Sequence, residues 1–183
     1  MHQLLDALWK RKTPKPTKVR VPGHFRQNLL WRISRSKAGI LSVFGITSFS
    51  ENTRAYLKIE DGCNNFCTYC IIPYRRGKLR SRLPNNIINE AIYLINQGYQ
   101  EIVLSGIHVG GYGQDLQNMT FSDLVEQLLT IPHLSSLRIS SIEESEIDDK
   151  LITLLQTKSN LAKHLHIPLQ SGSDRILKLM NRK

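Results

Sequence analysis

Along residues 55–183, the hydrophobic positions switch repeatedly between a two-residue period and a helical period. The alternation at 55–60 predicts a β-strand with two different faces. Further short apolar runs predict strands at 101–105, 136–142 and 164–169. After the strands, apolar residues recur at helical spacing, which predicts helices at 86–97, 121–129, 145–155 and 171–180.

The ends of these helices carry residues that commonly start or stop a helix. Gly98 stops the first helix, and Thr120 with Asp123 makes a capping box for the second. Ser-x-x-Asp patterns at 145–148 and 171–174 open the last two helices. The chain therefore predicts four strand–helix units in succession.

Such a succession predicts an α/β fold with parallel strands that are joined by right-handed crossovers. In these sheets, functional residues gather at the carboxyl ends of the strands. Each predicted strand is followed by a polar or glycine-bearing cluster, at 61–70, 105–108, 141–144 and 170–173. The pattern alone therefore predicts that these four clusters share one face of the fold.

All three cysteines of the chain, Cys63, Cys67 and Cys70, lie in the first cluster with the spacing C-x3-C-x2-C. Their odd number argues against a disulfide framework, and a structural zinc site needs four ligands. Cys67 and Cys70 alone would suit a dithiol redox pair, but Cys63 would then have no role. Three thiolates would also suit a four-iron cluster that leaves one iron open. The spacing favours the cluster, with a dithiol pair, a zinc site or buried thiols as the alternatives.

The other three clusters offer candidate cofactor contacts. These candidates are Ser105, Gly106, Ser141, Glu143 and Gln170. Each has an ordinary alternative, because Ser105 and Gly106 also suit a turn and Glu143 also suits the start of a helix. Gln170 would either cap a backbone group or line a cofactor pocket. His108 is predicted to be structural or substrate-facing rather than a metal ligand.

Five cations without an acid follow the cysteines: Arg75, Arg76, Lys78, Arg80 and Arg82. Guanidinium groups suit bidentate contacts with phosphate, so this segment is a candidate RNA contact. The alternative is a solvated surface, or pairing with carboxylates of the same chain. The segment lies between the cysteines and the first helix, on the expected functional face.

The chain has 183 residues, of which 40% are hydrophobic and 22% charged, as is usual for a soluble globular domain. No apolar run approaches the roughly 20 residues of a membrane span, and no signal peptide is recognised, so we expect a cytoplasmic location. The net charge of +10 comes mostly from residues 1–37, which hold ten Lys or Arg and one acid. This basic arm is predicted to be poorly ordered, with a nucleic-acid contact or an organelle presequence as alternatives.

The run DGCNNFCTYCIIP at 61–73, with Arg-Gly at 76–77 and Ser-Arg at 81–82, resembles the radical S-adenosylmethionine (SAM) tRNA methylthiotransferases. The resemblance implies a partial (βα) barrel in which the three cysteines hold a 4Fe-4S cluster and SAM binds the open iron. The SAM contacts expected with it are Tyr69, Ser105, Gly106, Ser141, Glu143 and Gln170. The expected RNA contacts are Arg75, Arg76, Arg80 and Arg82. The implied partners are tRNA and an electron-donating reductase.

The run SGIHVGGYGQD at 105–115 is most similar to the branch that methylthiolates N6-threonylcarbamoyladenosine at position 37 of tRNA, with the isopentenyladenosine branch as the alternative. Residues 1–50 contain no cysteine, whereas the resemblance implies a second cysteine triad there, and we expect the family's RNA-binding domain to be absent as well. We therefore expect a fragment, with a basic segment at 1–50 and a partial radical SAM core at 51–183. The alternatives from other classes are a non-catalytic RNA-binding protein and a dithiol oxidoreductase.

Overall fold

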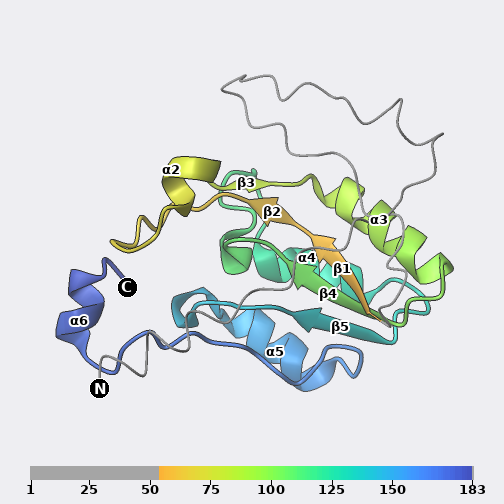
Figure 1. The fold of residues 1–183 in the computed structure, drawn as a ribbon. Coiled ribbons are helices and arrows are strands. Elements are labelled where there is room, and N and C mark those ends of the chain that lie inside the picture. Colours follow the sequence, from red (N-terminus) through yellow and green to blue (C-terminus); the bar gives the residue numbers. More distant parts are fainter. Residues whose placement is uncertain (1–53, 183) are drawn as a thin grey trace, which may run out of the picture. The chain divides into compact units, whose positions relative to one another are not determined.

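The computed structural model describes residues 54–182, all of which belong to one compact unit. The predicted basic segment at 1–50 and its boundary with the core lie outside the described residues. The described elements (Figure 1) are β1 (Arg54–Lys58), β2 (Glu60–Asp61), α2 (Ile72–Arg76), β3 (Arg80–Ser81), α3 (Pro84–Asn96), β4 (Glu101–Ser105), η2 (Val109–Gly111), α4 (Phe121–Leu129), β5 (Ser136–Ile139), η3 (Glu144–Glu146), α5 (Asp149–Thr157) and α6 (Asp174–Leu179). None of these helices has the length and apolar character that crossing a membrane requires.

Strands β1, β4 and β5 form a parallel sheet with β4 in the centre, which confirms the predicted α/β class. The register places Leu57 beside Leu104, and Leu104 beside Ile139, so apolar side chains run across the sheet. In β1, Ala55 and Leu57 are fully buried while Tyr56 is exposed. The alternation of the sequence therefore places one face of β1 in the core, while the central strand β4 buries Ile102, Val103 and Leu104 on both of its faces.

Helices α3, α4 and α5 pack side by side and cover the buried side of the sheet (Figure 1). Their buried apolar residues are Ile87, Ala91, Leu94, Phe121, Leu124, Val125, Leu128, Leu129, Leu151 and Leu154. The capping box of α4 is confirmed, because the Thr120 side chain accepts the amide of Asp123 and the Asp123 carboxylate accepts the amide of Thr120. Helix α3 begins with Pro84 in its first turn, where a missing amide costs nothing.

The fourth predicted strand is the main difference between expectation and structure. Residues 164–169 form no continuous strand among the described residues, and their pairing is reduced to a parallel bridge between Ser141 and His166. Pro168 has no amide to donate to a strand, and most side chains of the segment are exposed. The segment therefore follows the sheet edge without joining it as a full strand.

The third helix also begins later than predicted. Ser145 lies in the 3-10 turn η3, and α5 starts after Asp148, whose side chain accepts the amide of Leu151 at 2.7 Å. The aspartate of the Ser-x-x-Asp pattern is thus the N-cap, and its serine is not. Asp148 also accepts a hydrogen bond from the hydroxyl of Ser122 at 2.6 Å, which connects α5 to the start of α4.

A short antiparallel pair, β2 with β3, was not predicted from the hydrophobic pattern. It frames residues 62–71, which we call the cysteine loop. Gly62 turns the chain out of β2 with a φ of 86°, and the amide of Cys63 donates to the carbonyl of Gly77 at 3.2 Å. The first cysteine is therefore held by backbone contacts to the segment that joins α2 and β3.

Candidate functional site

The cysteine loop follows β1 and β2 at the carboxyl edge of the parallel sheet, as predicted. The segments after β4 and β5 reach the same place. His108 follows β4, and its Nε2 lies 3.4 Å from the side-chain amide of Asn65 in the cysteine loop. The same nitrogen pairs with Glu146, which follows β5. Three segments that are distant in sequence therefore meet at one edge of the sheet.

The three cysteines are free and partly buried. Burial is the largest influence on the pKa of the Cys63 thiol and raises it, while the Asn65 amide opposes this and the thiols of Cys67 and Cys70 add to it. The three sulfur atoms are thus close enough to interact electrostatically. Among the described residues, no three Cys, His, Asp or Glu side chains converge as a single metal ion requires. Cysteine thiolates are the usual ligands of iron–sulfur clusters, so three cysteines on one loop are a donor set of the type that a cluster takes.

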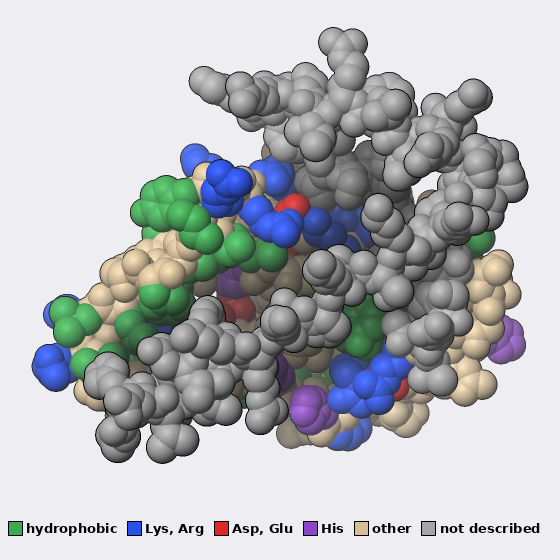
Figure 2. Space-filling view, in the orientation of Figure 1, with side chains coloured by type: hydrophobic (Ala, Val, Ile, Leu, Met, Phe, Trp, Pro, Cys, Tyr) green, Lys and Arg blue, Asp and Glu red, His purple; other side chains and the backbone are tan. Residues whose placement is uncertain are grey.

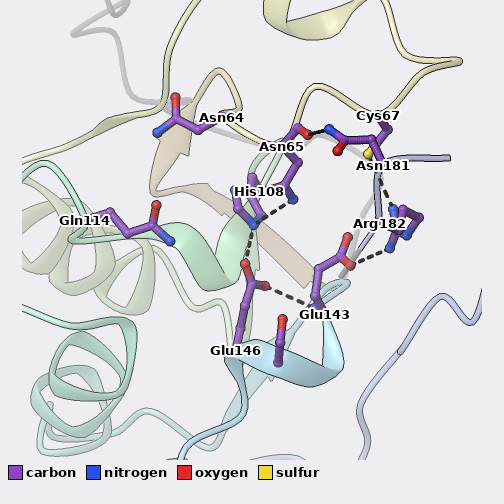
Figure 3. A pocket seen from close by; sticks show the side chains of 10 residues that line it. Asn64, Asn65, Cys67, His108, Gln114, Glu143, Glu146, Asn181 and Arg182 are labelled. Atoms are coloured by element: carbon purple, nitrogen blue, oxygen red, sulfur yellow. Dashed lines mark hydrogen bonds and ion pairs between the residues drawn. The ribbon is translucent and has the colours of Figure 1, made fainter. Parts of the chain in front are cut away.

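A polar cavity of about 470 Å³ opens beside the cysteine loop (Figure 3). Its volume falls within the range of about 300–1,000 Å³ that is typical of small-molecule sites. The lining residues are Asn64, Asn65, Cys67, His108, Gln114, Glu143, Ser145, Glu146, Asn181 and Arg182. Carboxylates, an imidazole and a guanidinium face the same space, so the cavity suits a ligand that carries both charges.

His108 connects the loop after β4 to both of the other segments. Its side chain is 7% exposed, and Nε2 points toward Glu146 and Asn65 (Figure 3). Burial by itself would lower the pKa of His108, but the hydrogen bond and negative charge of Glu146 outweigh burial and raise it. Glu146 also accepts the amide of Glu143 at 3.1 Å. One carboxylate therefore holds both the imidazole and the turn after β5.

Glu60 supports the same loop from inside the fold. It is fully buried, and its Oε1 accepts the amide of His108 at 2.7 Å. Burial raises the pKa of Glu60, and the amide hydrogen bonds from His108 and Ile107 offset this only in part. A Cβ at Gly106 would overlap the Glu60 carboxylate, so a glycine is required for this close approach.

The turn after α6 forms hydrogen bonds with backbone groups of the cysteine loop. The carbonyl of Met180 accepts the amide of Thr68 at 3.1 Å. The side-chain amide of Asn181 donates to the carbonyls of Asn65 and Phe66, at 3.0 and 3.1 Å. Phe66 and Asn181 both have left-handed backbones, with φ of 48° and 55°. Such conformations persist where surrounding contacts hold them, as these hydrogen bonds do here.

Arg182 adds a charged contact to this turn. Its guanidinium pairs with Glu143, lies 3.9 Å from the sulfur of Cys67 and donates to the hydroxyl of Tyr69 at 3.3 Å. The side chain is 9% exposed, so these interactions are largely shielded from water. One cation thus connects the cysteine loop with the turn after β5 (Figure 3).

The predicted SAM contacts occupy different places. Glu143 lines the cavity, and Tyr69 meets it through their shared contact with Arg182. The remaining four lie outside the lining of this cavity: Ser105, Gly106, Ser141 and Gln170. Ser141 and Gln170 are exposed. These six assignments stay predictions, and Glu143 is the one of them that lines the cavity together with Cys67.

The predicted RNA contacts are also divided. Arg76 pairs with Asp61 at 3.1 Å, and Arg82 pairs with Glu90 at 2.6 Å in a largely buried position. Arg76 and Arg82 are therefore paired with carboxylates of the same chain, which was the alternative to an RNA contact for this segment. Arg75 is exposed and forms no ion pair among the described residues. The cations of this segment therefore differ in how available they are to a ligand.

Several residues of the cavity were not singled out from the sequence: Asn64, Asn65, Gln114, Ser145, Glu146, Asn181 and Arg182. Gln114, Ser145 and Glu146 follow predicted strands, so their position was a usable signal. Asn181 is 116 residues away from its partner Asn65, and no local pattern predicts that contact.

A parallel α/β sheet with a C-x3-C-x2-C loop at its carboxyl edge defines the class of this protein. Residues 57–183, more than half of the chain, match the family described as the Radical SAM superfamily. The chain therefore belongs to the radical SAM superfamily, whose members use a 4Fe-4S cluster and SAM.

Within that superfamily the chain is similar to tRNA methylthiotransferases. It is 49% identical over 148 residues to the threonylcarbamoyladenosine tRNA methylthiotransferase MtaB of Bacillus subtilis, covering 80% of this chain and 33% of that protein. It is 42% identical over 139 residues to a tRNA-2-methylthio-N(6)-dimethylallyladenosine synthase of Dictyoglomus thermophilum, covering 76% and 32%. The chain thus spans about a third of the length of these curated relatives.

Among solved structures, the chain is similar to the radical SAM methyltransferase TsrM of Kitasatospora setae with cobalamin and a [4Fe-4S] cluster bound. The TM-score is 0.54 at 15% identity, over 67% of this chain and 23% of that one. TsrM with tryptophan and a SAM analogue bound matches equally well, with a TM-score of 0.54. At this identity the likeness supports the fold alone, and it agrees with the predicted α/β architecture.

Proposed function

We propose that this chain is the core portion of a radical SAM tRNA methylthiotransferase that modifies C2 of N6-threonylcarbamoyladenosine at position 37 of tRNA. The observation that carries this proposal is the cysteine loop at the carboxyl edge of the sheet, with Cys67 facing a polar cavity. The 49% identity to the Bacillus subtilis enzyme supports this nucleoside. The 42% identity to a dimethylallyladenosine enzyme keeps the isopentenyladenosine branch as the second candidate.

In this proposal Cys63, Cys67 and Cys70 hold the 4Fe-4S cluster, and the adjoining cavity holds SAM. When bound, the cluster supplies the electron that cleaves SAM. Glu143 and Arg182 pair with each other at the cavity, and SAM would bind there by exchanging this pair for contacts of its ammonium group with Glu143 and of its carboxylate with Arg182. Glu60 and Gly106 fix the position of His108, whose imidazole closes one side of the same space.

The proposed reaction also requires partners besides SAM. A cluster that donates electrons must be reduced again, which calls for an electron-donating reductase. The RNA substrate and the cytoplasmic location follow from the proposed reaction. Methylthio transfer further requires a sulfur donor, and the cysteine loop with its cavity would contribute the binding and cleavage of SAM.

Anaerobic reconstitution of the full chain with iron and sulfide tests the proposal. We expect an EPR signal of a reduced cluster that changes when SAM is added, and 5′-deoxyadenosine after reduction with dithionite. A chain that stays folded and soluble but incorporates no iron would refute the proposed cofactor. A reversible Cys67–Cys70 disulfide without iron would instead support a dithiol oxidoreductase.

Replacing Asn181 with alanine is expected to lower iron incorporation by about half or more. The substitution removes both hydrogen bonds to the carbonyls of Asn65 and Phe66, each worth roughly 1 kcal/mol, and releases the strained backbone between two cysteines. The measurement is the iron content per chain after reconstitution. Arg175→Ala, an exposed change on α6, is the matched control and should load like the unmodified chain. Equal loading of Asn181→Ala and the control would contradict a role for this turn.

A further inference from the structure

Three large apolar side chains of the cysteine loop and α2 point into solvent. Phe66, Ile71 and Tyr74 are 44%, 64% and 72% exposed, and we call them the aromatic platform. The rings of Phe66 and Tyr74 meet edge to face, with centroids 5.7 Å apart and planes at 80°. Figure 2 shows hydrophobic side chains gathered over α2. Exposed apolar groups in one patch commonly mark a binding surface.

The platform is not a part of the core that failed to pack. Helix α2 has five residues and buries one of them, Pro73, so its other side chains are free to face outward. The Tyr74 hydroxyl has no hydrogen-bond partner among the described residues. The backbone of Phe66 is anchored, because its carbonyl accepts a hydrogen bond from Asn181 at 3.1 Å, and its ring packs edge to face against Tyr74. A rigid aromatic surface loses little entropy when it binds a partner.

Three cations that follow closely in the sequence have no carboxylate partner in the part of the chain that the structure describes. Arg75 and Lys78 are exposed, and neither forms an ion pair among the described residues. Among the described residues, the guanidinium of Arg80 donates to the carbonyls of Arg76 and Lys78, at 2.9 and 3.2 Å, and pairs with no carboxylate. Lys and Arg side chains border the hydrophobic patch in Figure 2. The combination favours an anionic partner with planar apolar groups.

The platform lies on the rim of the cavity. Asn65 and Cys67 line the cavity, while Phe66 between them faces outward. A ligand on the platform would therefore place its neighbouring unit at the cavity mouth. An unpaired nucleotide stretch has bases that stack on aromatic rings and phosphates that bind Arg and Lys, which matches both properties of this surface.

We propose that the aromatic platform stacks an unpaired base of the RNA substrate next to the reacting nucleotide, while Arg75 and Lys78 bind the adjoining phosphates. This inference rests on the proposed function for the identity of the RNA, and it adds a contact surface to it. A second copy of this chain is the competing occupant, because exposed apolar patches also mediate self-association.

The test is binding of the full chain to a short RNA hairpin whose single-stranded loop carries 2-aminopurine. Stacking on the platform should quench its fluorescence. Tyr74→Ala should weaken binding roughly 5- to 100-fold, the effect of one lost base stack, whereas Tyr74→Phe should keep both affinity and quenching. Arg75→Gln should reduce the slope of log K against log salt by about 0.7 for one lost phosphate contact. Tyr93→Ala on α3, an exposed tyrosine outside the cysteine loop and α2, is the control for loss of a tyrosine ring.

Equal RNA affinity of Tyr74→Ala and Tyr93→Ala would overturn the proposal. If Tyr74→Ala instead abolishes a dimer in sedimentation and leaves RNA binding unchanged, the platform is an interface between copies. None of these measurements needs the cluster. If the chain binds RNA through Tyr74 but does not cleave SAM, the platform is supported and the proposed function is refuted. If the chain cleaves SAM but does not bind RNA through Tyr74, the proposed function is supported and the platform is refuted.

Discussion

Cys67→Ala is expected to abolish the reduced-cluster EPR signal and the formation of 5′-deoxyadenosine. Cys67 is the cysteine that lines the cavity, and Arg182 lies 3.9 Å from its sulfur. With two thiolates left, the loop would offer a four-iron cluster half of the four thiolates that such clusters usually take, and a second iron would be left without a protein ligand. The measurements are iron and sulfide per chain, EPR after reduction, and the yield of 5′-deoxyadenosine.

Thr68→Ala provides the control for this change. Thr68 is the next residue in the cysteine loop, its side chain is exposed, and its hydrogen bond to Met180 uses the backbone amide. This variant should therefore load iron and cleave SAM like the unmodified chain. Full iron content in Cys67→Ala, with an unchanged EPR signal, would show that this cysteine is not a cluster ligand.

Gly62→Ala is expected to destabilise the fold by at least about 3 kcal/mol. The backbone at this position has a φ of 86°, and an added Cβ would overlap the carbonyl of Lys78. The contact atoms belong to the backbone, so no side chain can rotate away to relieve the overlap. The adjoining hydrogen bond from Cys63 to Gly77 would be disturbed as well. The free energy of unfolding is measured by denaturant titration.

Gly98→Ala separates the two causes of this loss. Gly98 has a similar φ of 94°, but an added Cβ would meet nothing within 4 Å. The control should therefore cost only the penalty for a left-handed backbone, about 1–2 kcal/mol. If both substitutions lower the free energy of unfolding by the same amount, the overlap with the Lys78 carbonyl does not contribute to the loss. The cysteine loop would then not depend on that close contact.

The hydrophobic pattern predicted most of the sheet and its helices because burial acts locally on each element. Alternation in β1 and the helical spacing of α4 both reflect which side chains face the core. The pattern failed at residues 164–169, where Pro168 and the exposure of the neighbouring side chains prevent a continuous strand. It also missed β2 and β3, since two-residue strands are too short to show a period.

The sequence predicted those parts of the site that depend on local spacing, as it did for the fold. The cysteine spacing and the polar residues after each strand are visible in the sequence, and parallel topology explains why they converge. The contacts of Asn181 and Arg182 join segments more than a hundred residues apart, as the separations of 116 and 115 show. Such pairs depend on how the chain folds back, which no local window contains.

The sequence by itself determined the α/β class, the cluster-type cysteine spacing and the family resemblance, because these depend on residue type and on spacing over short distances. The tertiary structure decided which polar groups share the cavity, which cations are neutralised and which aromatic side chains stay exposed. Arg76 and Arg82 look equivalent to Arg75 in the sequence, yet carboxylates from other elements pair with them. Pairing, burial and exposure are properties of neighbours in space, so only the folded chain assigns them.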